Sequence, residues 1–342
     1  MISLRGRSIR VVTVALVVCA AAIAAGCGEK SESTTHGTPQ PFTLSLDWYV
    51  NPDHAGIYEA LDGGYFRDAG LDVKPETPSD PSAPLKEVAA GRVDLAISYE
   101  PEVLLAHDQG LPVKAVAALV PTPLTSMIWL KDSGIKSITD LRGKTIATAG
   151  IPYQEAYLKT ILARANLSPS DVKTVNVGYG LLPAIVGGRA QAMLGGFRNV
   201  EGIDLRLRGK APVVKPVDQL GVPTYDELVL VAQRRRLEED PETVRLFLAA
   251  LARGTAAADK SPDAAAKALL EANQDLDPAQ TRAEVAATLP LLQPEPGHPY
   301  GYMDPKRWAG FIEWMHGNGL ISSAPAPSSV LTDAYLPGGV PK

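Results

Sequence analysis

Short apolar runs alternate with longer amphipathic stretches from Phe42 to about residue 240. The runs are rich in β-branched residues, and the alternation is typical of a mostly parallel α/β sheet. The predicted strands are residues 43–46, 95–98, 113–119, 127–130, 145–148, 174–177, 192–194 and 228–232. The first two thirds of the chain are therefore expected to be α/β.

The last third carries the pattern of a helical array. Four dipeptides place a capping side chain before a proline, which is favoured at the first helical position. They are Asp240-Pro241, Ser261-Pro262, Asp277-Pro278 and Asp304-Pro305. We expect a helix to begin at each of them.

The composition turns polar at two places, residues 131–138 after strand 127–130, and residues 217–225 before strand 228–232. If both strands cross between lobes, the chain enters a second lobe and returns. This predicts a discontinuous first lobe, 42–130 plus 226–342, and a second lobe, 131–225. Two lobes joined by two strands form a hinge with a cleft between them.

The N-terminus has the features of an export signal. Arg5, Arg7 and Arg10 precede an apolar stretch, residues 11–23, which is shorter than a membrane span. The following Ala24-Ala25-Gly26-Cys27 resembles a bacterial lipobox, which implies a signal peptide over residues 1–26 and a lipid on Cys27. An ordinary secretory signal with an incidental cysteine is the alternative. The polar residues 27–41 predict a flexible linker, and the protein is expected outside the cytoplasm, held to the membrane by its lipid alone.

Composition excludes several classes of site. The chain has 342 residues and a formal net charge of −5, and removal of residues 1–26 changes the charge to −8. An acidic chain does not favour nucleic-acid binding. Its two cysteines, Cys19 and Cys27, exclude a disulfide framework or a cysteine-rich metal site, and its five histidines have no metal-ligand spacing. We expect a monomer with no cofactor and no metal.

Several segments carry a family resemblance. They include LDWYVNPDHAGIYEALDGGYFRDAGLDV (46–73), GRVDLAISYEPEVLLA (91–106), DLRGKTIATAGIPYQEAYLKT (140–160), GGFRNVEG (195–202) and GVPTYDELVLVA (221–232). The chain resembles the substrate-binding proteins of ABC importers for thiamin pyrimidine precursors, which are related to fungal thiamin-pyrimidine synthase and to sulfonate and nitrate binders. The resemblance implies a type II periplasmic-binding-protein fold with a two-strand hinge. It also implies capture of a small aromatic ligand of the formylaminopyrimidine or hydroxymethylpyrimidine type and its delivery to a permease with its ATPase.

The candidate ligand-binding residues begin at the carboxyl end of strand 43–46, the edge at which open α/β sheets bind ligands. Asp47 and Trp48 follow this strand, and Asn51 and His54 lie in the loop before the next helix. Trp48 is expected to stack on an aromatic ligand, the alternative being a core indole. His54 is either a ligand contact or a structural residue of the helix start.

Further candidates follow other strands. Tyr99 and Glu100 come after strand 95–98, and Glu100 either accepts from a ligand amine or occupies the first turn of a helix. Tyr153 stands at the start of a helix and is expected to stack or hydrogen-bond. Tyr225 is a second aromatic candidate beside strand 228–232. Its neighbour Glu227 either joins the site or forms a hinge salt bridge.

The last group follows strand 192–194. Phe197, Asn199 and Glu201 are candidate ligand contacts, and the resemblance implies that Glu201 pairs with the pyrimidine amine. Arg198 departs from the family pattern. Facing solvent it has no role, whereas facing the cleft it favours an anionic or carbonyl-rich ligand.

The resemblance also raises an enzyme, the pyrimidine synthase. Its cofactor lysine corresponds to Ser98, its consumed histidine to Glu102, and its cysteine run to GVPTYDE, so every reactive group is missing. The chain is therefore expected to be a binding protein and not an enzyme. Riboflavin is the alternative ligand, a sulfonate or nitrate ranks lower, and a non-transport lipoprotein of adhesion or signalling is a third class.

Overall fold

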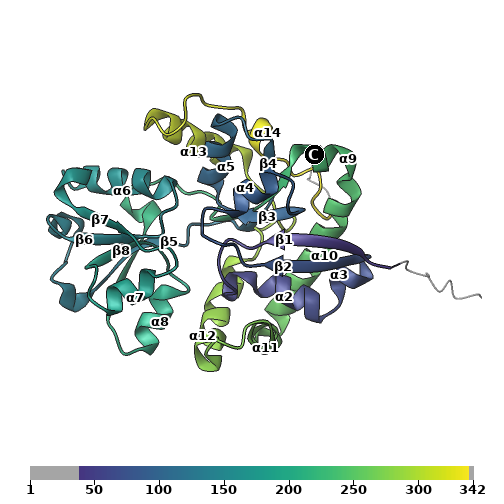
Figure 1. Ribbon diagram of the computed structural model, residues 1–342, viewed down its shortest axis with the longest axis horizontal. Coiled ribbons are helices and arrows are strands. Elements are labelled where there is room, and N and C mark those ends of the chain that lie inside the picture. Colours follow the sequence, from purple (N-terminus) through teal and green to yellow (C-terminus); the bar gives the residue numbers. More distant parts are fainter. Residues whose placement is uncertain (1–37, 339–342) are drawn as a thin grey trace, which may run out of the picture. The chain divides into compact units, whose positions relative to one another are not determined.

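The computed structural model describes residues 38–338 (Figure 1). The predicted signal peptide, Cys27 and most of the predicted linker lie outside the described residues. The described chain forms two mixed five-stranded sheets. We call each sheet with its helices a lobe, numbered in chain order. Among residues 38–338 no helix is long and apolar enough to span a membrane.

The first sheet has the strand order β2-β1-β3-β10-β4. Its strands are β1 (Gln40–Ser45), β2 (Leu71–Glu76), β3 (Leu95–Ser98), β4 (Val113–Val120) and β10 (Leu228–Gln233). Strand β1 runs parallel to β2 and β3, whereas β10 is antiparallel to β3 and β4. The central strand β3 is buried along its whole length, which explains its uninterrupted apolar sequence.

Helices cover both faces of this sheet. Successive side chains of β1 point to opposite faces, so β1 contacts helices on both sides. Phe42 stacks on Phe247 of α10 at 4.8 Å between ring centroids, while Ser45 on the other face hydrogen-bonds Glu87 of α4. The helices between the first strands are α2 (Ala55–Asp62), α3 (Tyr65–Asp68), α4 (Pro84–Ala89) and α5 (Glu100–Asp108).

The second sheet has the order β7-β6-β8-β5-β9. Its strands are β5 (Thr125–Leu130), β6 (Thr145–Thr148), β7 (Lys173–Asn176), β8 (Ala192–Phe197) and β9 (Pro212–Pro216), and its helices are α6 (Tyr153–Arg164), α7 (Leu181–Val186) and α8 (Glu201–Leu207). Short 3-10 helices connect the elements of both lobes. They are η1 (Pro52–His54), η2 (Lys131–Ser133), η3 (Ile138–Leu141), η4 (Pro169–Asp171), η5 (Val217–Leu220) and η6 (Leu289–Leu291).

The chain passes between the sheets earlier than the sequence predicted. Strand β5, which contains the predicted strand 127–130, pairs with β8 and β9 of the second sheet. The first passage is therefore residues 121–124, and the expected boundary at residue 130 is wrong. The polar segment after residue 130 marks the end of β5. The passage itself contains Pro121 and Pro123, which end a strand because proline lacks an N–H.

The predicted linker also ends earlier, since Gln40 and Pro41 belong to β1. The N–H of Gln40 faces β2 and donates to the carbonyl of Gly70, so the ring nitrogen of Pro41 faces the other side. Strand β3 pairs with β1 only from Leu44 onward. Proline is tolerated at this position because no ladder bond is required of it.

The C-terminal third is helical, as predicted. It contains α9 (Arg234–Glu239), α10 (Pro241–Lys260), α11 (Pro262–Ala272), α12 (Pro278–Thr288), α13 (Pro305–Gly317) and α14 (Pro327–Val330). The four predicted starts are confirmed, and the side chains of Asp240, Asp277 and Asp304 accept from backbone N–H groups of the first turn. Figure 1 shows α12 reaching toward α8 of the second lobe, and the two helices are in contact.

Candidate functional site

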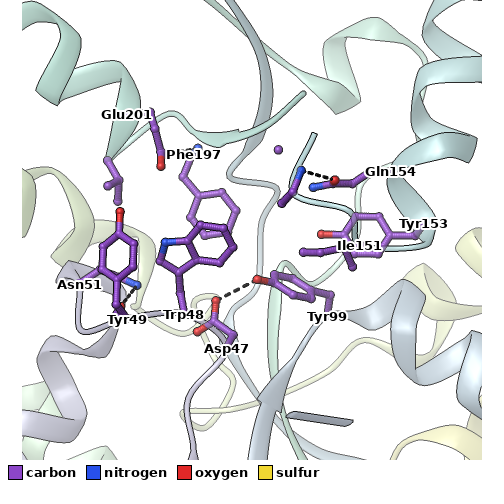
Figure 2. A pocket seen from close by; sticks show the side chains of 13 residues that line it. Asp47, Trp48, Tyr49, Asn51, Tyr99, Ile151, Tyr153, Gln154, Phe197 and Glu201 are labelled. Carbon is purple, nitrogen blue, oxygen red and sulfur yellow. Dashed lines mark hydrogen bonds between the residues drawn. The ribbon is translucent and has the colours of Figure 1, made fainter. Parts of the chain in front are cut away.

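A cavity lies where the two sheets direct their loops toward each other (Figure 2). The first lobe contributes residues after β1 and β3, namely Asp47, Trp48, Tyr49, Asn51 and Tyr99. The second lobe contributes residues after β6 and around the end of β8, namely Ala149, Ile151, Tyr153, Gln154, Gly195, Phe197, Val200 and Glu201. The cavity therefore lies at strand ends from both lobes.

The structure brings seven of the predicted ligand-binding residues to this cavity. They are Asp47, Trp48, Asn51, Tyr99, Tyr153, Phe197 and Glu201. The other four, His54, Glu100, Asn199 and Tyr225, are fully buried outside the lining. Strand ends were thus a good guide to the segments that reach the cavity and a weaker guide to the direction of each side chain.

His54 supports the cavity from behind through Asp47. Its Nδ1 accepts from the N–H of Asn51 at 3.3 Å, so the proton of the neutral ring lies on Nε2, which faces Asp47 Oδ1 at 2.9 Å. Tyr99 donates its hydroxyl to Asp47 Oδ2 at 3.0 Å, so both carboxylate oxygens are occupied. Asp47 therefore orients Tyr99, and of the two roles weighed for His54 the structure favours the structural one.

Asn51 shapes the loop that carries the aromatic residues. Its Oδ1 accepts from the N–H of Asp53 at 2.8 Å, and its Nδ2 donates to the carbonyl of Tyr49 at 3.1 Å. These bonds cap η1 and hold Trp48 and Tyr49 at the cavity.

Aromatic rings form much of the cavity wall. Figure 2 shows Trp48, Tyr99 and Tyr153 directed toward the same space, Trp48 and Tyr99 from the first lobe and Tyr153 from the second. The rings of Tyr99 and Tyr153 are 5.5 Å apart across the lobes. Trp48 makes an edge-on contact at 4.4 Å with Tyr179, whose hydroxyl donates to the carbonyl of Pro78. Such a wall suits a flat aromatic ligand.

Gln154 is a polar residue of the cavity that the sequence analysis missed. Its Oε1 accepts from the N–H of Ala149 at 2.9 Å, and among the described residues its Nε2 has no hydrogen-bond partner. Gly195 makes room for this amide, because a Cβ at Gly195 would lie 2.3 Å from Gln154 Nε2. The sequence signals available were the position of Gln154 beside Tyr153 and the Gly195-Gly196 pair inside a strand, which indicates a close approach.

Glu201 is the acid of the cavity whose pKa is shifted. Burial raises the pKa of Glu201 to about 7, and the N–H of Phe197, which donates to Oε2 at 2.7 Å, opposes part of this rise. Near neutral pH the side chain is available both as a carboxylate and as a carboxylic acid. It can therefore accept one hydrogen bond and donate another to the same ligand.

The remaining predicted residues belong to the framework. Glu100 accepts from the N–H of Asp226 at 2.7 Å, and Tyr225 donates to Glu227 Oε2 at 2.9 Å. Arg198 lies outside the cavity lining and is half-buried, and its Nε donates to the carbonyl of Pro123 at 3.1 Å. The hinge salt bridge considered for Glu227 is wrong, because its partners are hydroxyl and backbone N–H groups.

Comparison with known proteins identifies the family to which this chain is similar. The family model described as NMT1/THI5 like matches residues 51–265. A Haemophilus influenzae protein named for thiamine biosynthesis is 36% identical over 83% of this chain and 89% of its own length. A formylaminopyrimidine-binding protein of Halalkalibacterium halodurans is 36% identical over 80% and 83%, respectively. A pyrimidine phosphate synthase of Legionella pneumophila is 29% identical over 73% and 79%.

Solved structures confirm the fold. The alkanesulfonate-binding protein SsuA of Xanthomonas axonopodis pv. citri, bound to MOPS, has a TM-score of 0.67 and 17% identity, covering 86% of this chain and 99% of its own. The periplasmic-binding-protein fold implied by the sequence resemblance is therefore correct. At this identity the likeness carries the fold and not the ligand.

Proposed function

This chain belongs to the NMT1/THI5-like family, and from that premise we propose that it is the solute-binding protein of an ABC importer for a thiamin pyrimidine precursor. The ligand is of the formylaminopyrimidine or hydroxymethylpyrimidine type and occupies the cavity between the lobes. The observation that carries the proposal is a buried acid, Glu201, in a cavity walled by aromatic rings.

The polar groups of the cavity match an aminopyrimidine edge. A carboxyl group accepts from an exocyclic amine with one oxygen and, when protonated, donates to the neighbouring ring nitrogen with the other. Glu201 is suited to both because burial raises its pKa to about 7. The Nε2 of Gln154, which has no hydrogen-bond partner among the described residues, supplies a donor for a carbonyl or hydroxyl oxygen of the ligand.

The charge of the cavity favours this ligand over a sulfonate or nitrate. Among the described residues the lining contains Asp47 and Glu201 and no lysine, arginine or histidine. Binding of an anion normally relies on cationic or multiple N–H donors. The formylaminopyrimidine-binding relative at 36% identity favours a single pyrimidine ring over the three fused rings of riboflavin.

We propose no reaction at this site. The positions of the synthase lysine and histidine are Ser98 and Glu102 here, and the Ser98 hydroxyl donates to Glu102 Oε2 at 2.7 Å outside the cavity lining. Neither group provides the amine needed for a Schiff base.

A thermal-shift panel tests the ligand. Formylaminopyrimidine or hydroxymethylpyrimidine is expected to raise the melting temperature, because a ligand that binds only the folded state stabilises it. Riboflavin, taurine and nitrate are expected to leave it unchanged. A shift with riboflavin or taurine alone would contradict the proposal.

Calorimetry of Glu201→Ala tests the residue. Alanine removes both carboxyl oxygens and with them the acceptor and the donor offered to the ligand, so we expect affinity to fall by more than about tenfold. Glu284→Ala is the matched control, because Glu284 lies outside the lining and its carboxyl group is bonded to Gln280. Unchanged affinity in Glu201→Ala would remove this residue from the site.

The proposal includes export and a lipid anchor on Cys27, with a monomeric binding protein delivering its ligand to a permease. In cells fed a labelled fatty acid, the wild-type protein is expected to carry label and to sediment with membranes. The Cys27→Ala variant is expected to do neither. Equal labelling of the two proteins would rule out this anchor.

A further inference from the structure

Three polar side chains link the lobes behind the cavity. Asn199, in the loop between β8 and α8, donates from Nδ2 to Asp53 Oδ1 and to Thr288 Oγ1, each at 2.8 Å. Asp53 belongs to η1 of the first lobe, and Thr288 ends α12. All three are at most 3% exposed and none lines the cavity. The contact is therefore a buried bond between the lobes and not a ligand contact.

Two oxygen atoms of this contact lack a partner. Within the described part of the chain, Asp53 Oδ2 and Asn199 Oδ1 are buried and accept no hydrogen bond. A buried acceptor without a partner is destabilising, because it has lost its hydrogen bonds to water and gained none in return. A proton on Asp53 Oδ2 supplies the missing donor, and Asn199 Oδ1 is the free acceptor on the side chain to which Asp53 is already bonded. A carboxylic acid and a carboxamide can pair through two antiparallel hydrogen bonds, of which the structure shows the one from Asn199 Nδ2 to Asp53 Oδ1.

The charges around Asp53 also favour the protonated form. Burial raises its pKa well above the ordinary value, the bond from Asn199 opposes this, and Asp47, Glu201 and Glu227 raise it further. His54 is bonded to Asp47 and not to Asp53. Among the described residues no lysine or arginine pairs with Asp53.

The helices packed against η1 contribute further acids, and none of their charged side chains is bonded to Asp53. Helix α12 contributes Glu284, on which Asp53 acts electrostatically, and α8, which packs on α12, contributes Asp204. The remaining charged residues of α2, α11 and α12 are Glu59, Asp62, Asp263, Lys267, Glu271 and Arg282, and none is hydrogen-bonded to Asp53. Within residues 38–338, no cation is therefore paired with a carboxylate at residue 53.

We propose that Asp53 and Asn199 form a protonated latch, and that closure of the lobes around the ligand takes up one proton from solvent onto Asp53. The latch rests on the proposed function, and it adds closure of the two lobes around the bound ligand. When the lobes separate, Asp53 meets water and returns the proton. Ligand affinity therefore falls as pH rises, by up to about tenfold per pH unit between the open-state pKa, about 4, and that of the closed state.

Calorimetry with formylaminopyrimidine at pH 6, in buffers of different ionisation enthalpy, counts the protons taken up. Asp53→Asn is the informative variant, because its amide keeps an oxygen for Asn199 Nδ2 and brings an N–H for Asn199 Oδ1. We expect Asp53→Asn to take up about one proton fewer and to bind at least as tightly as wild type, by up to about a hundredfold at pH 6, because the amide needs no proton to form the latch. Asp72→Asn, on the exposed side of β2, is the control and is expected to match wild type.

Equal proton uptake by wild type and Asp53→Asn overturns the latch. A loss of affinity in Asp53→Asn with an unchanged pH profile overturns it too, since that result describes a structural residue. If Asp53→Asn fails to fold, a measurement on the wild-type protein alone still tests the latch. In wild-type protein labelled with ¹³C at aspartate, infrared difference spectra are expected to show a protonated aspartic acid appearing with the ligand, and its absence overturns the proposal.

A ligand-free arm separates the latch from the ligand assignment. By small-angle scattering we expect wild type to be more compact at pH 5 than at pH 8, and Asp53→Asn to be equally compact at both. The same response in both proteins overturns the latch. Failure of every pyrimidine to bind, with this difference intact, overturns the proposed function alone.

Discussion

Glu227 is where the two passages between the lobes meet, and its replacement gives a sharp test of the architecture. Its Oε2 accepts from the N–H groups of Leu124 and Thr125 at 2.6 and 2.7 Å and from the hydroxyl of Tyr225 at 2.9 Å. Its Oε1 accepts from the hydroxyl of Thr125 at 2.7 Å. One buried carboxylate therefore holds the entry into β5 against the return to β10.

Glu227→Ala and Glu227→Gln are expected to differ widely. Alanine leaves two buried backbone N–H groups without an acceptor, at about 1–3 kcal/mol each, and opens a cavity in a fully buried place. We expect a loss of about 3–7 kcal/mol of unfolding free energy, a large share of the 5–15 kcal/mol typical of a domain. Glutamine can place its oxygen at the Oε2 position and donate its NH₂ to the hydroxyl of Thr125, so we expect a loss below about 1.5 kcal/mol.

Urea unfolding followed by circular dichroism measures both variants. Glu239→Ala on the exposed part of α9 is the control, and we expect it to change stability little. A loss below about 1 kcal/mol in Glu227→Ala would refute the role of this acceptor. A loss in Glu227→Gln as large as that in Glu227→Ala would show that the charge, and not the hydrogen bonds, holds the passages.

Three further variants test the site, its charge and the packing. Gly195→Ala is expected to displace Gln154 and to lower both the melting temperature and the ligand affinity. The φ of residue 195 is +114°, and the new Cβ would lie 2.3 Å from the amide nitrogen of Gln154. A wild-type melting temperature and a wild-type affinity would refute the close approach. Burial raises the pKa of Glu284 to about 8, so the folded state holds its proton where the unfolded state has lost it, and stability falls as pH rises from about 4.5 through 8. Glu284→Gln is expected to reduce the difference in unfolding free energy between pH 5 and pH 8 by about 1–3 kcal/mol, and an unchanged difference would contradict the assignment. Gly254→Ala is expected to lower the free energy of unfolding in urea by about 1–3 kcal/mol without altering ligand affinity. The new Cβ would lie 2.5 Å from the carbonyl of Gly56, where α10 crosses α2. Wild-type stability of this variant would refute the close packing.

The strands that the sequence analysis missed are β2 and β9, and both lie at sheet edges. Strand β2 reads LDVKPE and β9 reads PVVKP, with prolines and charges that a central strand excludes. An edge strand has one side free, so its sequence need not be apolar throughout. Apolar periodicity therefore identifies central strands better than edge strands.

The candidate site divides in the same way. Strand ends correctly indicated Trp48, Tyr99 and Glu201 as cavity residues, because the residue at which a strand ends can be recognised from the local sequence. Asn199 was expected in the same loop and instead bonds Asp53, which is 146 residues away. Nothing in the sequence around Asn199 indicates that partner.

The sequence by itself determined the α/β class, the helix starts at residues 241, 262, 278 and 305, and the family. Periodicity and capping act over a few residues, so a linear pattern contains them. Only the tertiary structure decided that β5 joins the second sheet, that Gln154 enters the cavity and that Glu227 holds both passages between the lobes. A buried polar group takes whichever donor or acceptor the packed chain brings near it, and for Glu227 that donor lies 102 residues away.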